Sequence, residues 1–147
     1  MMSESKFVYV TYIATTPEKV FQALTDGAVT RKYWGYENVS DWKVGSPWEH
    51  RSPEGTVRMV GEVLESAPPR RLVISWAYAA DKAAKGKHTR VKFEIEALGD
   101  MVRLTVTHED LTAGSEMDRG IREGWPRVLS SLKSFLETGK GLDVWRK

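Results

Sequence analysis

The sequence predicts an α+β fold in which a meandering antiparallel sheet packs against one long C-terminal helix. Two patterns predict it. Residues 42–108 carry six or so runs in which apolar and polar side chains alternate between short turns. Residues 115–138 instead carry apolar side chains at helical spacing. Strands that follow one another on short connections pair antiparallel, and a lone amphipathic helix must cover the apolar face of such a sheet.

The length of the chain fits one domain. Its 147 residues are enough to bury a core without disulfides or metal ions. The composition, 41% hydrophobic and 29% charged, is typical of a globular protein. We therefore expect a single domain over residues 1–147, with a core at about 7–139 and a short tail at 140–147.

The first predicted elements are a strand and a helix. Residues 7–13 are rich in β-branched and aromatic side chains, which favour a strand. Residues 15–18, Thr-Thr-Pro-Glu, supply a capping threonine, a proline for the first turn and an early acidic side chain. A helix of about nine residues therefore begins here and ends near Asp26. Residues 28–34 fit one or two further helical turns, which Gly35 stops.

The middle of the chain alternates with a period of two residues, which places every second side chain on the same face of a sheet. Turn-forming residues, mainly Gly, Pro, Ser and Asp, separate the alternating runs. The predicted strands lie at residues 42–44, 48–51, 56–65, 72–78, 91–96 and 102–108.

The last predicted element is the long helix. Ser115 is placed to cap its start, and Gly139 fits the position after its end. An apolar stripe that begins with Met117 and Ile121 runs along one side of it. Pro126 lies inside this pattern and is expected to remove one hydrogen bond and kink the helix near Ile121 or Arg122.

Composition and motif spacing exclude several function classes. The chain has no cysteine, which rules out disulfide scaffolds, thiol catalysis and cysteine-based zinc sites. Histidines and acidic residues lack metal-ligand spacing, so neither a metal nor a cofactor is expected. The net charge of +2, from 22 basic and 20 acidic residues, gives no footprint for nucleic acid. No apolar run reaches the ~18 residues of a membrane span and no signal peptide is recognisable, so we expect a cytoplasmic protein.

The unusual feature of the composition is its six tryptophans. Several of them fall on separate predicted elements, and those in strands have the parity of the apolar face. Core packing alone accounts for large aromatic side chains of this kind. The sharper interpretation is a cavity between the long helix and the sheet, walled by aromatic and apolar side chains. The candidate wall residues are Trp34, Trp48, Met59, Trp76, Tyr78, Phe93, Val106 and Trp125.

Two histidines are candidates for the polar anchors of that cavity. His50 shares the parity of Trp48, and His108 shares the parity of Leu104 and Val106. A hydrogen-bonded histidine near the rim of a core is the simpler alternative for each. His108 is also the one candidate acid or base, so an enzyme such as a cyclase or hydrolase acting on an apolar substrate is the less favoured interpretation. No residue is assigned as catalytic.

Several segments also resemble a known family. They are ATTPEKVFQALTD at 14–26, YWG at 33–35, GEVLESAPPRRLVISW at 61–76 and Gly124-Trp125 ahead of the last apolar stripe. From about residue 7 to residue 139, the chain resembles proteins similar to the C-terminal domain of the activator of heat-shock protein 90 ATPase. That family sits in the START-like, helix-grip superfamily, also called SRPBCC.

The resemblance implies a helix-grip fold, in which a curved antiparallel sheet wraps around one long C-terminal helix. The superfamily holds lipid carriers, sensors, polyketide cyclases and co-chaperone domains. We therefore expect a module that binds an apolar small molecule, lipid-like or aromatic, with a co-chaperone-like interaction domain as the alternative. Gly45-Ser46-Pro47 stands where the family often has two glycines, which counts against a chaperone partner. A homodimer is compatible with a small domain of this kind.

Overall fold

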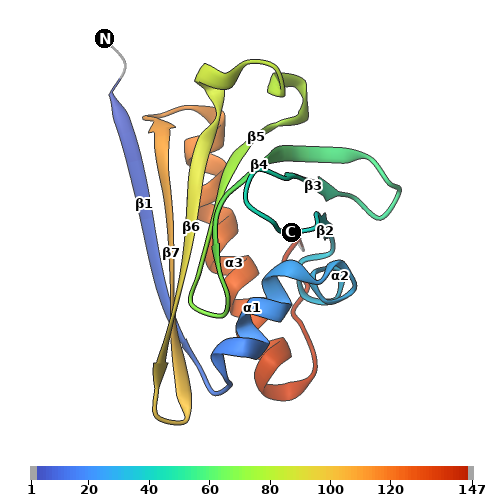
Figure 1. Ribbon diagram of the computed structural model, residues 1–147, viewed down its shortest axis with the longest axis vertical. Coiled ribbons are helices and arrows are strands. Elements are labelled where there is room, and N and C mark those ends of the chain that lie inside the picture. The colour runs from blue at the N-terminus through green and yellow to red at the C-terminus, as the bar shows by residue number, and fades with distance from the viewer. Residues whose placement is uncertain (1–2, 146–147) are drawn as a thin grey trace.

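The computed structural model describes residues 3–145, which form one seven-stranded sheet and three α-helices (Figure 1). The strands are β1 (Glu4–Ile13), β2 (Glu37–Val39), β3 (Pro47–Arg51), β4 (Val57–Ala67), β5 (Arg71–Tyr78), β6 (Thr89–Leu98) and β7 (Met101–Thr112). The helices are α1 (Pro17–Thr25), α2 (Gly27–Trp34) and α3 (Glu116–Thr138), and two short 3-10 turns, η1 (Ala79–Asp81) and η2 (Lys85–Lys87), lie between β5 and β6.

All neighbouring strands run antiparallel, in the order β1-β7-β6-β5-β4-β3-β2 across the sheet. Strands β2 to β7 thus form the meander that the sequence predicts, while β1 pairs with β7 at the far edge. Helix α3 runs along one face of the sheet, and α1 and α2 lie together near the β2 side (Figure 1). The α+β helix-grip fold is therefore confirmed.

Local signals in the sequence set the bounds of the helices. Thr16 Oγ1 accepts a hydrogen bond from a first-turn N–H of α1, and Pro17 is the first residue of that helix. Asp26 ends α1 and caps α2, because its Oδ1 accepts from the N–H of Ala28 at 2.9 Å. Gly35 ends α2 with a φ of 85°, a left-handed conformation that favours glycine.

The core lies between α3 and the face of the sheet that α3 covers. Alternate side chains of β6 and β7 are buried there, as the period-two pattern predicts. The helix contributes its apolar stripe, including Trp125, Leu129 and Leu132. None of the helices formed by residues 3–145 combines the length with the apolar content needed to cross a membrane.

One local expectation differs from the structure. The strand predicted at 42–44 is wrong, because β2 covers Glu37–Val39 and Trp42 lies in the following loop with a φ of 61°. Side chains form that loop: Ser40 Oγ accepts from the N–H of Trp42 at 2.9 Å, and Asp41 Oδ1 accepts from the N–H of Lys43 at 3.0 Å. Helix α3 continues through Pro126 to Thr138.

Candidate functional site

An open cleft of about 540 Å³ lies between the first half of α3 and the β3–β5 part of the sheet. The end of α2 and the C-terminal tail add to its wall. The lining is mainly aromatic and apolar, which is typical of small-molecule sites. The lining residues are Trp34, Tyr36, His50, Arg58, Met59, Trp76, Tyr78, Gly120, Ile121, Gly124, Trp125, Val128 and Trp145.

Three indole rings from three elements form the centre of the wall. The ring of Trp34, at the end of α2, is nearly parallel to that of Trp76 on β5, with centroids 6.3 Å apart and 11° between planes. The ring of Trp125 on α3 is tilted against both, with its centroid 5.5 Å from each. All three side chains are at most 7% exposed. The rings therefore hold one another in place, and the wall exists before any ligand arrives.

The ten predicted site residues divide into two groups. Six line the cleft, and they are Trp34, His50, Met59, Trp76, Tyr78 and Trp125. Four do not, and they are Trp48, Phe93, Val106 and His108, each at most 3% exposed. Phe93 packs edge-on against Trp125, and Trp48 packs against Trp76. Both therefore support the indole wall from behind instead of facing the cleft.

The Trp48 side chain packs over β4 at Gly61, where there is no room for any other residue. It lies directly opposite Gly61 in the β3–β4 register, and its Nε1–H donates to the carbonyl of Ser75 at 2.7 Å. A Cβ on Gly61 would lie 1.9 Å from that carbonyl oxygen and 2.3 Å from Trp48 Nε1. The missing side chain thus makes room for the indole that backs the wall.

A chain of hydrogen bonds positions His50. Thr30 on α2 is fully buried, and its Oγ1 accepts from the backbone N–H of Asn38 at 3.0 Å. The Oδ1 of Asn38 in turn lies 2.5 Å from His50 Nδ1, so Nδ1 carries the hydrogen and donates it. Burial lowers the pKa of His50 from 6.5 to about 3, so the ring is neutral near pH 7. A neutral ring with its hydrogen on Nδ1 has a bare lone pair on Nε2.

His108 is engaged on both sides of its ring. Trp125 Nε1–H donates to His108 Nδ1 at 3.1 Å, and His108 Nε2 lies 2.8 Å from Thr89 Oγ1. The Thr89 hydroxyl donates to the carbonyl of Trp76 at 2.7 Å, so it accepts from His108 Nε2–H. Burial lowers the pKa of His108 to about 3, against the opposing charge of Asp118. The neutral ring therefore holds Trp125 in its orientation through a hydrogen bond, and neither of its nitrogens is free to bind a substrate.

Two glycines open the helical side of the cleft. Gly120 and Gly124 lie one turn apart inside α3 and both line the cleft. A Cβ added at either position would meet no heavy atom within 4 Å. Glycine inside a helix costs about 1 kcal/mol relative to alanine. The helix therefore gives up stability at both positions, and the space beside the indole rings stays empty.

Sequence reasoning missed several cleft residues, of which Tyr36, Arg58 and Trp145 are the largest. Arg58 is exposed on β4, on the face opposite to the one assigned to the core, and nothing in the alternation marks it. Trp145 belongs to the tail, which was expected to lie outside the core. Its Nε1–H donates to the carbonyl of Trp34 at 2.8 Å, which brings its ring to the cleft. The tail is also tied to α3, because the N–H of Leu142 donates to Ser131 Oγ at 2.7 Å.

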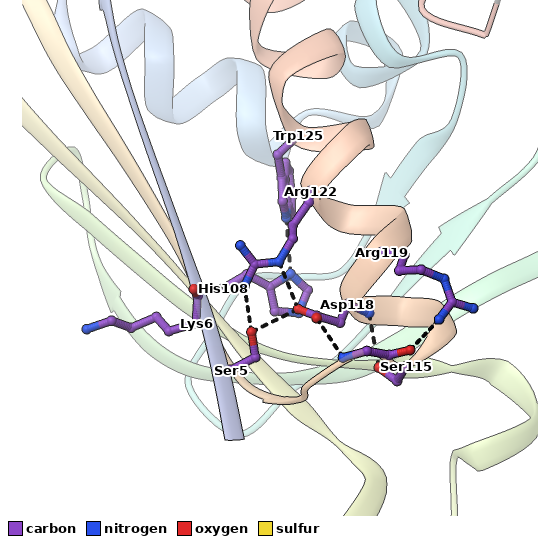
Figure 2. A network of polar contacts seen from close by, with 9 residues as sticks. Ser5, Lys6, His108, Ser115, Asp118, Arg119, Arg122 and Trp125 are labelled. Carbon is purple, nitrogen blue, oxygen red and sulfur yellow. Dashed lines mark hydrogen bonds and ion pairs between the residues drawn. The ribbon is translucent and has the colours of Figure 1, made fainter. Parts of the chain in front are cut away.

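A polar clasp fixes the start of α3 against β1 (Figure 2). Ser115 caps the helix, and its Oγ accepts from the N–H of Asp118 at 3.1 Å. The Asp118 carboxylate accepts from the N–H of Gly114, from the hydroxyl of Ser5 and from Arg122 Nε, each at 3.0 Å. The bond from Gly114 is the largest cause that lowers the pKa of Asp118. The spacing of Ser115 and Asp118, which is that of a capping box, was the sequence signal for the hydrogen bonds at the start of α3.

A larger hollow, of about 640 Å³, lies on the outer face of the sheet. Its charged side chains already pair with one another, as Arg71 does with Glu94 at 3.5 Å and Arg103 with Glu96. These exposed ion pairs make the hollow more polar than the aromatic cleft, and a polar wall suits an apolar ligand less well. The aromatic cleft under α3 is therefore the candidate site.

Comparison with solved structures finds this fold in other proteins. The Aha1 dimer from Colwellia psychrerythraea matches with a TM-score of 0.78 and 24% identity, over 93% of this chain and 99% of that chain. CalU16 from Micromonospora echinospora matches with a TM-score of 0.72 and 20% identity, over 95% and 87%. An HSP90 activator from Plasmodium falciparum matches with a TM-score of 0.68 and 22% identity, over 82% and 86%. At these identities the likeness establishes the fold alone.

The sequence itself matches one protein family. Among curated proteins the comparison finds no match. The model of the family described as "Activator of Hsp90 ATPase homolog 1-like protein" matches residues 14–137. That range holds all the cleft residues except Trp145. Because the match spans most of the chain, this protein belongs to the Activator of Hsp90 ATPase homolog 1-like family.

Proposed function

We propose that this protein binds an apolar small molecule, lipid-like or aromatic, in the cleft between α3 and the sheet. The observation that carries the proposal is an aromatic wall beside open space. Three indole rings meet at a cleft onto which Gly120 and Gly124 present no side chain. A ligand placed there gains the free energy of apolar burial, about 25 cal/mol per Å².

The size and chemistry of the cleft support binding over catalysis. Its volume of about 540 Å³ lies within the roughly 300–1,000 Å³ of small-molecule pockets. Among residues 3–145, no carboxylate lines it, and its charged or polar side chains are His50, Arg58 and Tyr78 with Tyr36 and the indole N–H groups. Proton transfer to a substrate needs a titratable group with a free site and a suitable pKa. His108 has both nitrogens engaged, and the pKa of His50 is far below neutrality.

The proposal is tested by binding and by a variant that fills the cleft. Apolar compounds, such as naphthalene derivatives and fatty acids, are titrated while tryptophan emission is recorded. A saturable change is expected, because any ligand in the cleft touches indole rings. Native mass spectrometry of the purified protein shows whether a compound is retained, and it counts the subunits, which tests a homodimer.

The filling variant is Gly124→Leu, which places an aliphatic side chain in the space beside Trp125. It should fold, because leucine favours the helix, and it should lose binding. The matched control is Glu123→Leu, which adds the same side chain on the exposed side of that helical turn. Binding that survives Gly124→Leu, or no response to any ligand class in the parent protein, would overturn the proposal.

A co-chaperone-like role is the second candidate. The family description and the HSP90 activator from Plasmodium falciparum favour it. Its test is the ATPase rate of purified Hsp90 with and without this protein. Stimulation that persists in Gly124→Leu would place this activity on a surface other than the cleft. An unchanged rate, together with a negative pull-down of Hsp90, would remove the candidate.

A further inference from the structure

The cleft is lined by a largely buried histidine, one of whose ring nitrogens has no hydrogen-bond partner among residues 3–145. The side chain of His50 is 4% exposed, and its Nδ1–H is committed to Asn38 Oδ1. Among residues 3–145, no group donates to His50 Nε2, while every fully buried polar side-chain atom has a partner. Nε2 therefore reaches the open cleft that His50 lines. An accessible acceptor at the end of a largely buried side chain can accept a hydrogen bond from a donor on the ligand.

The lone pair of Nε2 decides which polar group a ligand presents to it. A hydroxyl or N–H donates a hydrogen bond to this nitrogen, whereas a carboxylate, ketone or ether oxygen places a second lone pair against it. Protonating the ring to accommodate a carboxylate is opposed by burial, which lowers the pKa of His50. The ligand atom that meets Nε2 is therefore a hydrogen-bond donor, and a carboxylate oxygen does not fit at that position.

The aromatic rings around His50 limit the shape of the ligand group that can reach Nε2. Tyr36 stacks on His50 with centroids 4.6 Å apart and 27° between planes, and the ring of Trp34 lies 4.7 Å from it. With these aromatic neighbours, a donor reaches Nε2 along the edge of the imidazole ring. The ring of Trp76 lies 5.8 Å from His50. A hydroxyl borne directly on a flat ring meets Nε2 while the ring packs on the indole wall.

The positive charge of Arg58 in the wall disfavours a cationic ligand, which is the kind that aromatic cages commonly bind. Clustered indole rings bind quaternary ammonium groups when the site lacks competing positive charge. Here the charged lining residue is Arg58, and no ion pair joins it to another of residues 3–145. A positive side chain in the wall, without a lining carboxylate, repels a cation and tolerates a neutral or anionic compound.

From these features we infer that the ligand is a flat aromatic compound bearing a hydroxyl group, whose hydrogen is donated to Nε2 of His50. This inference rests on the proposed function, because it names the ligand class of the same cleft. It also separates the two chemistries left open by the sequence, an aromatic ligand and a lipid-like one. Phenolic aromatic compounds offer Nε2 a hydrogen, and deprotonated long-chain acids do not.

The experiment compares naphthol with methoxynaphthalene by calorimetry at pH 7. The two share a ring system, but the ether lacks the donor hydrogen. In the parent protein naphthol should bind about threefold to tenfold more tightly, as expected for one net hydrogen bond. In His50→Phe, which keeps an aromatic ring and removes both nitrogens, the ratio should fall to about one, while methoxynaphthalene still binds. His88→Phe is the matched control, because His88 lies outside the cleft and should leave the ratio unchanged.

A second measurement covers the case in which His50→Phe does not fold. Nitrogen NMR of the parent protein reports on Nε2 of His50 directly, and its resonance should move with naphthol and stay in place with methoxynaphthalene. Equal affinity for the two compounds, or a preference that survives His50→Phe, would overturn the inference and leave the proposed function standing. If neither compound binds, the inference is overturned, and the titration of the other ligand classes decides the proposed function.

Discussion

Acidification should destabilise this protein well before its carboxylates are protonated. His50 and His108 are 4% and 0% exposed, and burial lowers the pKa of each from 6.5 to about 3. In the unfolded chain both rings take up a proton below about pH 6.5, while in the native state both stay neutral. The unfolded state therefore binds more protons, and the free energy of unfolding falls as the pH falls.

The size of the effect follows from the two pKa values. Between pH 7 and pH 5, one histidine that shifts from 6.5 to about 3 removes about 2 kcal/mol of stability, and the two together remove about 4 kcal/mol. Asp118 and Glu137, whose pKa values are lowered by hydrogen bonds, add to the loss at still lower pH. The window from pH 5 to pH 6.5 thus isolates the histidines.

Urea unfolding at a series of pH values, followed by tryptophan emission, measures this slope. Each histidine should contribute about 1.2 kcal/mol per pH unit in the middle of the window. His108→Phe should lower overall stability, because Trp125 loses its acceptor, yet it should also flatten the slope by that amount. A free energy of unfolding that stays level between pH 7 and pH 5 would refute the claim that both rings are held neutral.

Two further predictions concern glycines. Gly120→Ala and Gly124→Ala should each stabilise the protein by about 1 kcal/mol, or about 2–4 °C in Tm, because a methyl group there favours the helix and meets open space. Calorimetric melting checks this, and a lowered Tm would show that the helix backbone needs glycine. Gly61→Ala should destabilise by about 2–4 kcal/mol, because its Cβ displaces the Trp48 indole and breaks the bond to Ser75. Urea unfolding measures the loss, and a change under about 0.5 kcal/mol would contradict the seating of Trp48.

The sequence predicted the elements of the fold well, because their physical signals are local. Alternation marked β3 to β7, and the capping residues Ser115 and Gly139 bounded α3 correctly. The position of β1 beside β7 was not predictable in this way, because periodicity does not encode which distant strand becomes a partner. Trp42 was misplaced because side-chain hydrogen bonds to the backbone, not alternation, determine its loop.

The candidate site was predicted in part, for a reason that lies in sheet geometry. Parity identifies the face of a strand, so it correctly placed Trp76 and Met59 on the side of the cleft. Parity does not show which part of that face the helix covers. Phe93 and His108 were therefore grouped with these residues, although Trp125 of α3 packs against both and separates them from the cleft. Trp145 has no periodic context at all, and only the folding of the tail onto α2 reveals it.

The cleft is wider where α3 carries Gly120 and Gly124, because neither residue places a side chain in it. Its dimensions are therefore adjustable by single substitutions that leave every strand and turn where it is. Alanine, valine and leucine at positions 120 and 124, with one, three and four side-chain carbons, form a graded series that narrows the cleft. Under the proposed function, these few carbon atoms on one face of α3 would set the breadth of compounds that the cleft admits.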